Sequence, residues 1–458
     1  MANQLAPHQL AYRALNRFSI GAKSGEYASA LTDPMGWVKA QLDEALLPSL
    51  LAPEVSSQQL LAQVQLLQKQ KRAERDGREA PIDPITHKPY ERVSNKLPID
   101  TFNRFNFSLI EAQMNTSNGV LFRLLDFFSN HFSVSRGSDV MKVLSVTFER
   151  EAILPHILGR FDSLLIAVEQ HPAMLVYLNN ERSFGPNSPK GKKSGLNENL
   201  AREILELHTL GVNGGYTQSD VTEMAKAITG WSIGNSNNGE IAGFAFRKQG
   251  HEPGSRTVLG KTFVEGGQSQ GEAVLSMLAN HPSTARHVST KLARYFIDDT
   301  PPMEVVDAMV DTWLNTGGEL TSVLNTLIFH NLTWQSQEMQ FKTPREFMVS
   351  TLRALDTSTV EEKLTIPWLR RFGQPPLEAN SPAGYSDFDY AWDSSYALLT
   401  RVDWIDMLTR RVPLDIESLM VNTGAAYFPP QRLMQIENAG NRELSASLML
   451  LSPDFLYR

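Results

Sequence analysis

Apolar residues recur at intervals of three and four along most of this chain, which is the spacing of α-helices. Proline and glycine interrupt this pattern, so residues 5–50 are predicted to form short helices broken at Gly21 and Pro34. Longer helices are predicted over residues 56–76, 100–132, 138–169, 271–280, 283–297, 303–315, 319–331, 344–356, 394–410 and 440–451. The pattern predicts a mainly α protein.

Two stretches depart from helical spacing. Residues 80–99 contain Pro81, Pro84, Pro89 and Pro98. They follow the helix at 56–76, so we expect a long helical arm with an irregular loop over residues 54–99. Residues 232–265 are rich in turn residues and alternate in parts, which predicts a small β-hairpin insertion.

Residues 365–393 form a third irregular stretch, rich in proline and aromatic residues. Such a loop either wraps over the core or forms one wall of a cleft. No repeat of fixed period is visible, so a solenoid is not expected. We therefore expect one large helical domain over residues 1–458, with the arm and the hairpin as additions to it.

The densest mixture of polar and apolar residues lies within residues 196–231. Five apolar side chains at helical spacing predict one buried stripe: Leu196, Leu200, Ile204, Leu207 and Leu210. A glycine-rich connection follows over 211–215, where positive φ angles are tolerated. Thr217 and Asp220 then have the spacing of a capping box, which predicts the start of the next helix.

Charged residues accompany this stripe. Arg202 stands four positions from both Glu198 and Glu206, which is the spacing of helical ion pairs. Glu203 and Glu206 share an adjacent face, and two such carboxylates suit a divalent metal or acid–base catalysis. The alternative is a structural network in which Arg202 neutralises its neighbours, since ion-pair networks cluster in the same way.

Three histidines extend this candidate site. His208 ends the same helix, where an imidazole either ligates a metal or interacts with the helix dipole. His131 closes an apolar helix, and His251 lies near the turn of the predicted hairpin, in a loop of the kind that often carries function. The candidate catalytic residues are Arg202, Glu203, Glu206 and His208, and the candidate metal ligands are His131, Glu203, His208 and His251.

Composition narrows the classes of function. The net charge of −7 argues against a dedicated nucleic-acid-binding protein. The absence of cysteine removes disulfides, thiolate nucleophiles and Cys-ligated metals. No apolar run approaches the ~18 residues of a membrane span. The sequence also lacks the P-loop, dinucleotide-binding and HExxH motifs, and Glu203 has no His three residues later as in di-iron bundles.

The run NENLAREILELHTLGVNGGYTQSDVTEMAKAITGW closely resembles the signature of the bacterial "domain of unknown function 1800" family. Further matches occur in the right order along nearly the whole chain: ALNRFSIG, FFSNHFSVS, LGRFDSLLIAVEQHPAMLVYL, HEPGSRTVLGKTF, HPSTARHVSTKLARYF, TPREFMVSTLRALD, PAGY and LSPDFLYR. The resemblance implies a mostly helical bacterial protein without an assigned activity. In the hairpin the chain reads His-Glu-Pro-Gly-Ser-Arg where His-Asp and a later Lys are expected, so the charge types are kept.

The resemblance also bears on partners and compartment. Genes of this family often neighbour those of the "domain of unknown function 1501" family, which implies a partner protein and a role in the cell envelope. That context favours a periplasmic or secreted protein. The N-terminus lacks the charged-then-apolar pattern of an export signal, which favours the cytoplasm instead.

Two functional hypotheses follow. The first is a hydrolase-like enzyme that uses zinc, manganese or calcium held by the histidines and carboxylates named above. A metal-free version uses Glu203 or Glu206 as the base and His208 as the acid. The second is a non-catalytic binding or assembly protein whose central polar residues form an ion-pair network that specifies the packing.

Overall fold

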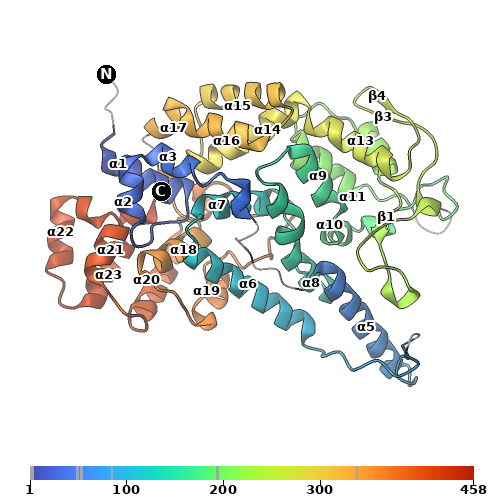
Figure 1. Cartoon of the computed structure of the whole chain (residues 1–458), viewed down its shortest axis with the longest axis horizontal. Coiled ribbons are helices and arrows are strands. Elements are labelled where there is room, and N and C mark those ends of the chain that lie inside the picture. The colour runs from blue at the N-terminus through green and yellow to red at the C-terminus, as the bar shows by residue number, and fades with distance from the viewer. Residues whose placement is uncertain (1–4, 48–50, 52–54, 84–85, 192–194, 337–338) are drawn as a thin grey trace.

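The structure is a computed structural model that describes residues 5–47, 51, 55–83, 86–191, 195–336 and 339–458. It is mainly helical, as predicted, and its two small sheets lie together at one end of the molecule (Figure 1). Residues 54, 84 and 85 of the predicted arm and residues 1–4 of the predicted domain lie outside the described residues. None of the described helices is long and apolar enough to cross a membrane.

The N-terminal part of the chain is entirely helical apart from its connections. Its helices are α1 (Pro7–Arg13), the π-helix η1 (Ala14–Phe18), α2 (Glu26–Thr32), α3 (Pro34–Lys39), α5 (Ser57–Arg75), α6 (Leu97–Asn115), α7 (Gly119–His131), α8 (Asp139–Phe148), the π-helix η3 (Glu149–Ile153), α9 (Phe161–Gln170) and α10 (Pro172–Tyr177). The helix predicted over 138–169 is therefore interrupted. Pro155 and Gly159 stand in the interruption, and both residues disfavour a continuous helix.

The helix α5 lies within the predicted arm and packs along one side against the rest of the chain. Ser56 and Gln59 cap it reciprocally. Leu60, Leu61 and Val64 are buried where α5 packs against α8. The segment between α5 and α6 is irregular where it is described, and its tip lies at the lower edge of the molecule (Figure 1).

The middle part contains the central motif and both sheets. Its elements are α11 (Asn199–Glu203), the π-helix η6 (Ile204–Thr209), α12 (Gln218–Ala227), β1 (Trp231–Ile233), β2 (Phe244–Phe246), β3 (Arg256–Val258), β4 (Lys261–Phe263), α13 (Gln268–Ala279), α14 (Pro282–Phe296), α15 (Met303–Thr316), α16 (Leu320–Phe329) and α17 (Asn331–Gln335). β1 pairs antiparallel with β2, and β3 pairs antiparallel with β4. The single hairpin expected over 232–265 is thus two hairpins, because β2 pairs back with β1 while β3 and β4 pair with each other.

The C-terminal part forms a second group of helices. These are α18 (Pro344–Ala354), α19 (Ile366–Arg371), α20 (Ser395–Thr409), α21 (Ile416–Asn422), α22 (Pro430–Glu437), α23 (Arg442–Leu450) and α24 (Pro453–Leu456). The sequence pattern did not predict α19, α21 or α22. They are only six to eight residues long, and tertiary packing stabilises helices too short to be stable alone.

Two hydrophobic cores meet at α18. The larger core gathers residues from the N-terminal and middle parts, and the smaller one gathers residues from the C-terminal part together with Ile110 and Met114 of α6. Phe347 of α18 belongs to the smaller core and Val349 to the larger. A helix buried on all sides in this way fixes the position of its N-terminus, beside which a polar pocket opens.

Candidate functional site

The helix that carries the predicted charges changes from α to π geometry between α11 and η6. A π turn contains an extra residue, which rotates the side chains that follow it. Leu205 and His208 consequently point into the core, whereas Leu207 is only half-buried. The predicted stripe is confirmed at Leu200, Ile204 and Leu210, whereas Leu196 and Leu207 are only half-buried.

The charges at the start of this helix join it to α12. Arg202 Nη2 lies 3.5 Å from Glu198 Oε2 and donates to Gln218 Oε1 at 2.9 Å. Glu198 accepts a further bond from Gln218 Nε2 at 2.8 Å, and Glu206 accepts from the Tyr216 hydroxyl at 3.1 Å. The predicted Glu198–Arg202 pair is confirmed, whereas no ion pair joins Arg202 to Glu206 among the described residues. The arrangement is that of a structural network for Arg202.

His208 forms a fully buried pair with a residue that the sequence did not single out. Its Nδ1 lies 2.7 Å from Glu169 Oε1 of α9, and both side chains are inaccessible to solvent. His131 is also buried, with its Nε2 3.2 Å from the His208 carbonyl oxygen. Burial and the neighbouring Lys291 hold the pKa of His131 well below its ordinary value. The structure therefore brings His131 and His208 together, as neighbours in a closed core.

The remaining predicted residues lie in other surroundings. Glu203 is half-buried, and burial raises the pKa of its carboxyl. His251 is held at the sheets, where its Nδ1 lies 2.9 Å from the Thr229 carbonyl oxygen. Among the described residues, no three His, Asp or Glu side chains are grouped so that they could hold a metal ion. The predicted set of His131, Glu203, His208 and His251 thus finds no support in the geometry.

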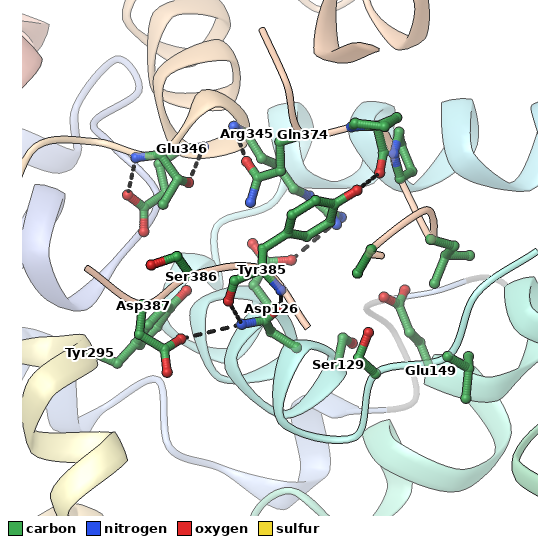
Figure 2. Close-up of a pocket in the computed structure, with 18 of the residues that line it drawn as sticks. Asp126, Ser129, Glu149, Tyr295, Arg345, Glu346, Gln374, Tyr385, Ser386 and Asp387 are labelled. Carbon is green, nitrogen blue, oxygen red and sulfur yellow. Dashed lines mark hydrogen bonds and ion pairs between the residues drawn. The ribbon is translucent and has the colours of Figure 1, made fainter. Parts of the chain in front are cut away.

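A polar pocket opens instead where the two cores meet. It has a cavity volume of about 100 Å³, enough for several water molecules or a small ligand. Figure 2 shows α18 with Arg345 and Glu346 on one side and α7 with Asp126 and Ser129 on the other. Parts of the loop 374–387 close it, so the Pro- and aromatic-rich stretch forms one wall of a cleft, which was one of its two predicted roles. We call this cavity the Asp126 pocket.

Asp126 is the acid of this pocket whose pKa is raised. It accepts hydrogen bonds from Gln113 Nε2 at 3.1 and 3.2 Å and lies 3.4 Å from Arg345 Nη2. Burial raises the pKa of Asp126 to about 6, and the carboxylate of Glu149 adds to this rise while Arg345 opposes it. Near neutral pH this carboxyl can therefore exchange a proton with a bound molecule.

Glu149 is the second acid of the pocket. It is the first residue of the π-helix η3 and is 8% exposed. In the described part of the chain its carboxyl group has neither an ion pair nor a hydrogen bond. A buried carboxylate that lines a cavity without a protein partner is available to a ligand.

Hydrogen bonds hold the walls of the pocket in place. Asn130 accepts from the Tyr385 amide at 2.8 Å and donates to the Tyr385 carbonyl oxygen at 2.9 Å. Gly384 has a φ of +77°, and a side chain there would come within 2.5 Å of Asn130, so this contact requires glycine. Asp387 lies 3.3 Å from Lys291 of α14. These contacts hold the loop against α7 and keep the cavity open.

Two buried polar atoms of the lining have unused hydrogen-bonding capacity. Ser129 Oγ and Arg345 Nε have no hydrogen-bond partner among the described residues. Asp126, Ser129 and Asn130 stand at i, i+3 and i+4 on one face of α7. That polar face within the otherwise apolar run of α7 was the sequence signal that could have identified the pocket. Glu149 gave no comparable signal, because a tertiary contact alone places it there.

The comparisons with known proteins place the whole chain in one family. A family model described as "Protein of unknown function (DUF1800)" matches residues 13–457. Neither a search of curated proteins nor a search of solved structures finds a match. The comparisons therefore assign no reaction to the chain, and the reaction is inferred from the geometry of the pocket.

Proposed function

The chain belongs to the DUF1800 family of proteins of unknown function, and on that premise we propose that it is an enzyme that hydrolyses a small polar substrate in the Asp126 pocket. One observation carries the proposal. Two carboxylates, Asp126 and Glu149, line the same cavity, and their surroundings give one of them a pKa of about 6 while the other lacks a partner. A carboxyl that holds its proton near neutral pH, beside a second carboxyl without a protein partner, suits general acid and base catalysis.

The proposed step uses both carboxyls. Protonated Asp126 donates its proton to the leaving group as the scissile bond breaks, and Glu149 removes a proton from the attacking water as the new bond to oxygen forms. Afterwards Glu149 holds the extra proton, and exchange with solvent restores the starting state. The residues Ser129 and Arg345 line the same cavity.

The test is hydrolysis of ester and glycoside panels with leaving groups of different basicity. We expect Asp126→Asn to lower kcat by about 10²–10⁴-fold for alkyl leaving groups and much less for nitrophenyl ones, which depart without a proton. Activity should fall as pH rises above about 6, because Asp126 then loses its proton. Glu149→Gln should lower kcat for both kinds of leaving group.

The matched control is Asp403→Asn, which removes an exposed carboxylate on α20 and should leave the rates unchanged. The proposal fails if the chain hydrolyses no member of the panels. It also fails if Asp126→Asn and Glu149→Gln retain the wild-type rates on every substrate that the chain does hydrolyse.

Other parts of the functional hypothesis stay predictions. These are dependence on zinc, manganese or calcium, a role in the cell envelope, and association with a protein of the domain of unknown function 1501 family. Metal analysis of the purified protein, before and after His208→Ala, tests the first. Since His208 is inaccessible and bonded to Glu169, that variant should change stability rather than metal content.

A binding or assembly role is the second candidate, and the surface of α20 favours it. Tyr396, Leu399 and Val402 are 67%, 65% and 45% exposed and stand three residues apart, so they form an apolar stripe. If this stripe binds the family-1501 partner, Leu399→Lys should abolish co-elution of the two proteins in size-exclusion chromatography. Unchanged co-elution, or none for the wild type, would remove this support.

A further inference from the structure

A buried glutamine lies behind the acid of the Asp126 pocket. Gln113 of α6 is inaccessible to solvent and does not line the cavity. Its Nε2 donates to both carboxyl oxygens of Asp126, at 3.1 and 3.2 Å, and its Oε1 accepts from Arg345 Nη2 at 3.4 Å. One side-chain amide therefore joins α6 to a pocket residue of α7 and to a pocket residue of α18.

The neighbours of this amide determine its orientation. A guanidinium group can only donate, so the oxygen of Gln113 faces Arg345 and the NH₂ group faces Asp126. Arg345 Nη2 also lies 3.4 Å from Asp126 Oδ1, so both of these neighbours of the carboxyl are donors. A protonated Asp126 cannot give its proton to either of them. Its side chain is 15% exposed and lines the cavity, so the proton is left for an acceptor there.

The end of α6 is itself held in place by α18. Nη1 of Arg353 donates to the carbonyl oxygens of Gln113 and Met114, at 2.9 and 3.3 Å. The Arg353 side chain is inaccessible, and Glu26 balances its charge at 2.8 Å. Contacts from α18 thus fix both the backbone and the side chain of Gln113, which keeps the amide against Asp126.

The other groups that interact with Asp126 are charged or titratable. They come from every helix around it: Arg123 of α7, Glu149 of η3, Tyr295 of α14, and Arg345 and Glu346 of α18. Gln113 differs from them because it is neutral and does not titrate. It can keep its hydrogen bonds to the carboxyl group in both protonation states, whereas a lysine at this position would favour the anion.

Taking the proposed function as the premise, we propose that Gln113 is the positioning residue of the acid. Its amide holds the Asp126 carboxyl group from behind, so that the proton of the acid points into the cavity and towards the leaving group. Since Gln113 does not line the cavity, it acts only through Asp126.

A titration of the acid in Gln113→Met tests this role without any substrate. Methionine has nearly the same size but no donor, so the charged carboxylate loses a hydrogen bond. The pKa of Asp126 should therefore rise from about 6 by about one pH unit. NMR titration of the chain with carbon-13-labelled aspartate carboxyls measures this, and Asp126→Asn identifies the signal. Gln113→Asn withdraws the donor by one carbon and should raise the pKa by less; it decides the question if Gln113→Met does not fold.

The panels of leaving groups give a second readout. In Gln113→Met the acid is no longer held in position, so kcat for alkyl leaving groups should fall by about tenfold or more, while nitrophenyl leaving groups should be affected little. The pH above which activity falls should rise together with the pKa of Asp126. A purely structural role of Gln113 would instead slow both kinds of leaving group equally.

Gln65→Met is the matched control. Gln65 is 8% exposed and also bridges two segments, because its Nε2 donates to the Gly234 carbonyl oxygen and its Oε1 accepts from the Ser236 amide, both at 2.8 Å. This variant should lower thermal stability and leave both the titration of Asp126 and the leaving-group pattern unchanged.

Two results would overturn the role of Gln113. The first is a pKa of Asp126 that stays at the wild-type value in the Gln113 variants. The second is an equal loss of kcat for alkyl and nitrophenyl leaving groups. If the wild-type chain hydrolyses no member of the panels, the proposed function fails, and the titration alone still decides whether Gln113 holds the acid.

Discussion

Glu346 of α18 is the charge whose removal should cost this protein the most stability. It forms ion pairs with Arg123 of α7 and with Arg458, whose Nε lies 3.1 Å from Glu346 Oε2. The three side chains are 7%, 1% and 4% exposed. Glu346→Gln keeps the size of the side chain and the acceptor for the Thr343 amide, but it leaves two buried guanidinium groups without a counter-charge.

Two arguments give the expected loss in the free energy of unfolding. Breaking a buried pair by removing one partner costs about 3–5 kcal/mol. Independently, burial acts to raise the pKa of Glu346, yet Arg123 and Arg458 lower it from 4.5 to about 2. The pKa of Glu346 is thus about 2.5 lower in the folded chain than its ordinary value, which corresponds to roughly 3 kcal/mol of stability at 1.36 kcal/mol per pKa unit. We therefore expect Glu346→Gln to lower the free energy of unfolding by about 3–5 kcal/mol at pH 7.

The pH dependence has a defined sign. The pKa of Glu346 is depressed in the folded chain, so its contribution is fully present above pH ~4.5 and is lost as pH falls towards ~2. Urea denaturation followed by circular dichroism at several pH values measures this. The variant should show a shallower loss of stability over that window than the wild type. Glu443→Gln, which changes an exposed carboxylate on α23, should behave like the wild type. A loss below about 1 kcal/mol, or an unchanged acid dependence, would refute the reasoning.

Two further predictions concern the central motif. Asp220→Ala removes both the reciprocal cap with Thr217 and the acceptor for the Leu259 amide at 2.7 Å, so it should lower the free energy of unfolding by about 1–2 kcal/mol. Urea denaturation measures this, and an unchanged midpoint would contradict the prediction. The conservative variant Asp220→Asn should lose less stability. His208→Phe leaves Glu169 as an unpaired buried charge and should cost about 3–5 kcal/mol, whereas the double variant with Glu169→Leu should recover much of that loss. Equal stabilities of the single and double variants would show that the buried charge is not the cause.

The sequence by itself determined the local structure and the family. Periodicity predicted the long helices, and the spacing of Thr217 and Asp220 predicted a capping box that the structure confirms. The i, i+4 spacing of Glu198 and Arg202 predicted their ion pair, which is present. These features depend only on residues within one or two helical turns of each other, so the local sequence is enough to predict them.

Only the tertiary structure decided what the polar residues of the motif face. The π turn of η6 turned His208 towards Glu169 of α9, a partner that lies 39 positions away in the chain. Likewise, Asp126 and Glu149 meet at one cavity because the two cores join at α18 and the loop 374–387 closes over them. Burial and the charge of Glu149 then set the pKa of Asp126. Desolvation and long-range Coulomb interactions depend on packing between distant segments, and no local spacing in the sequence encodes that packing.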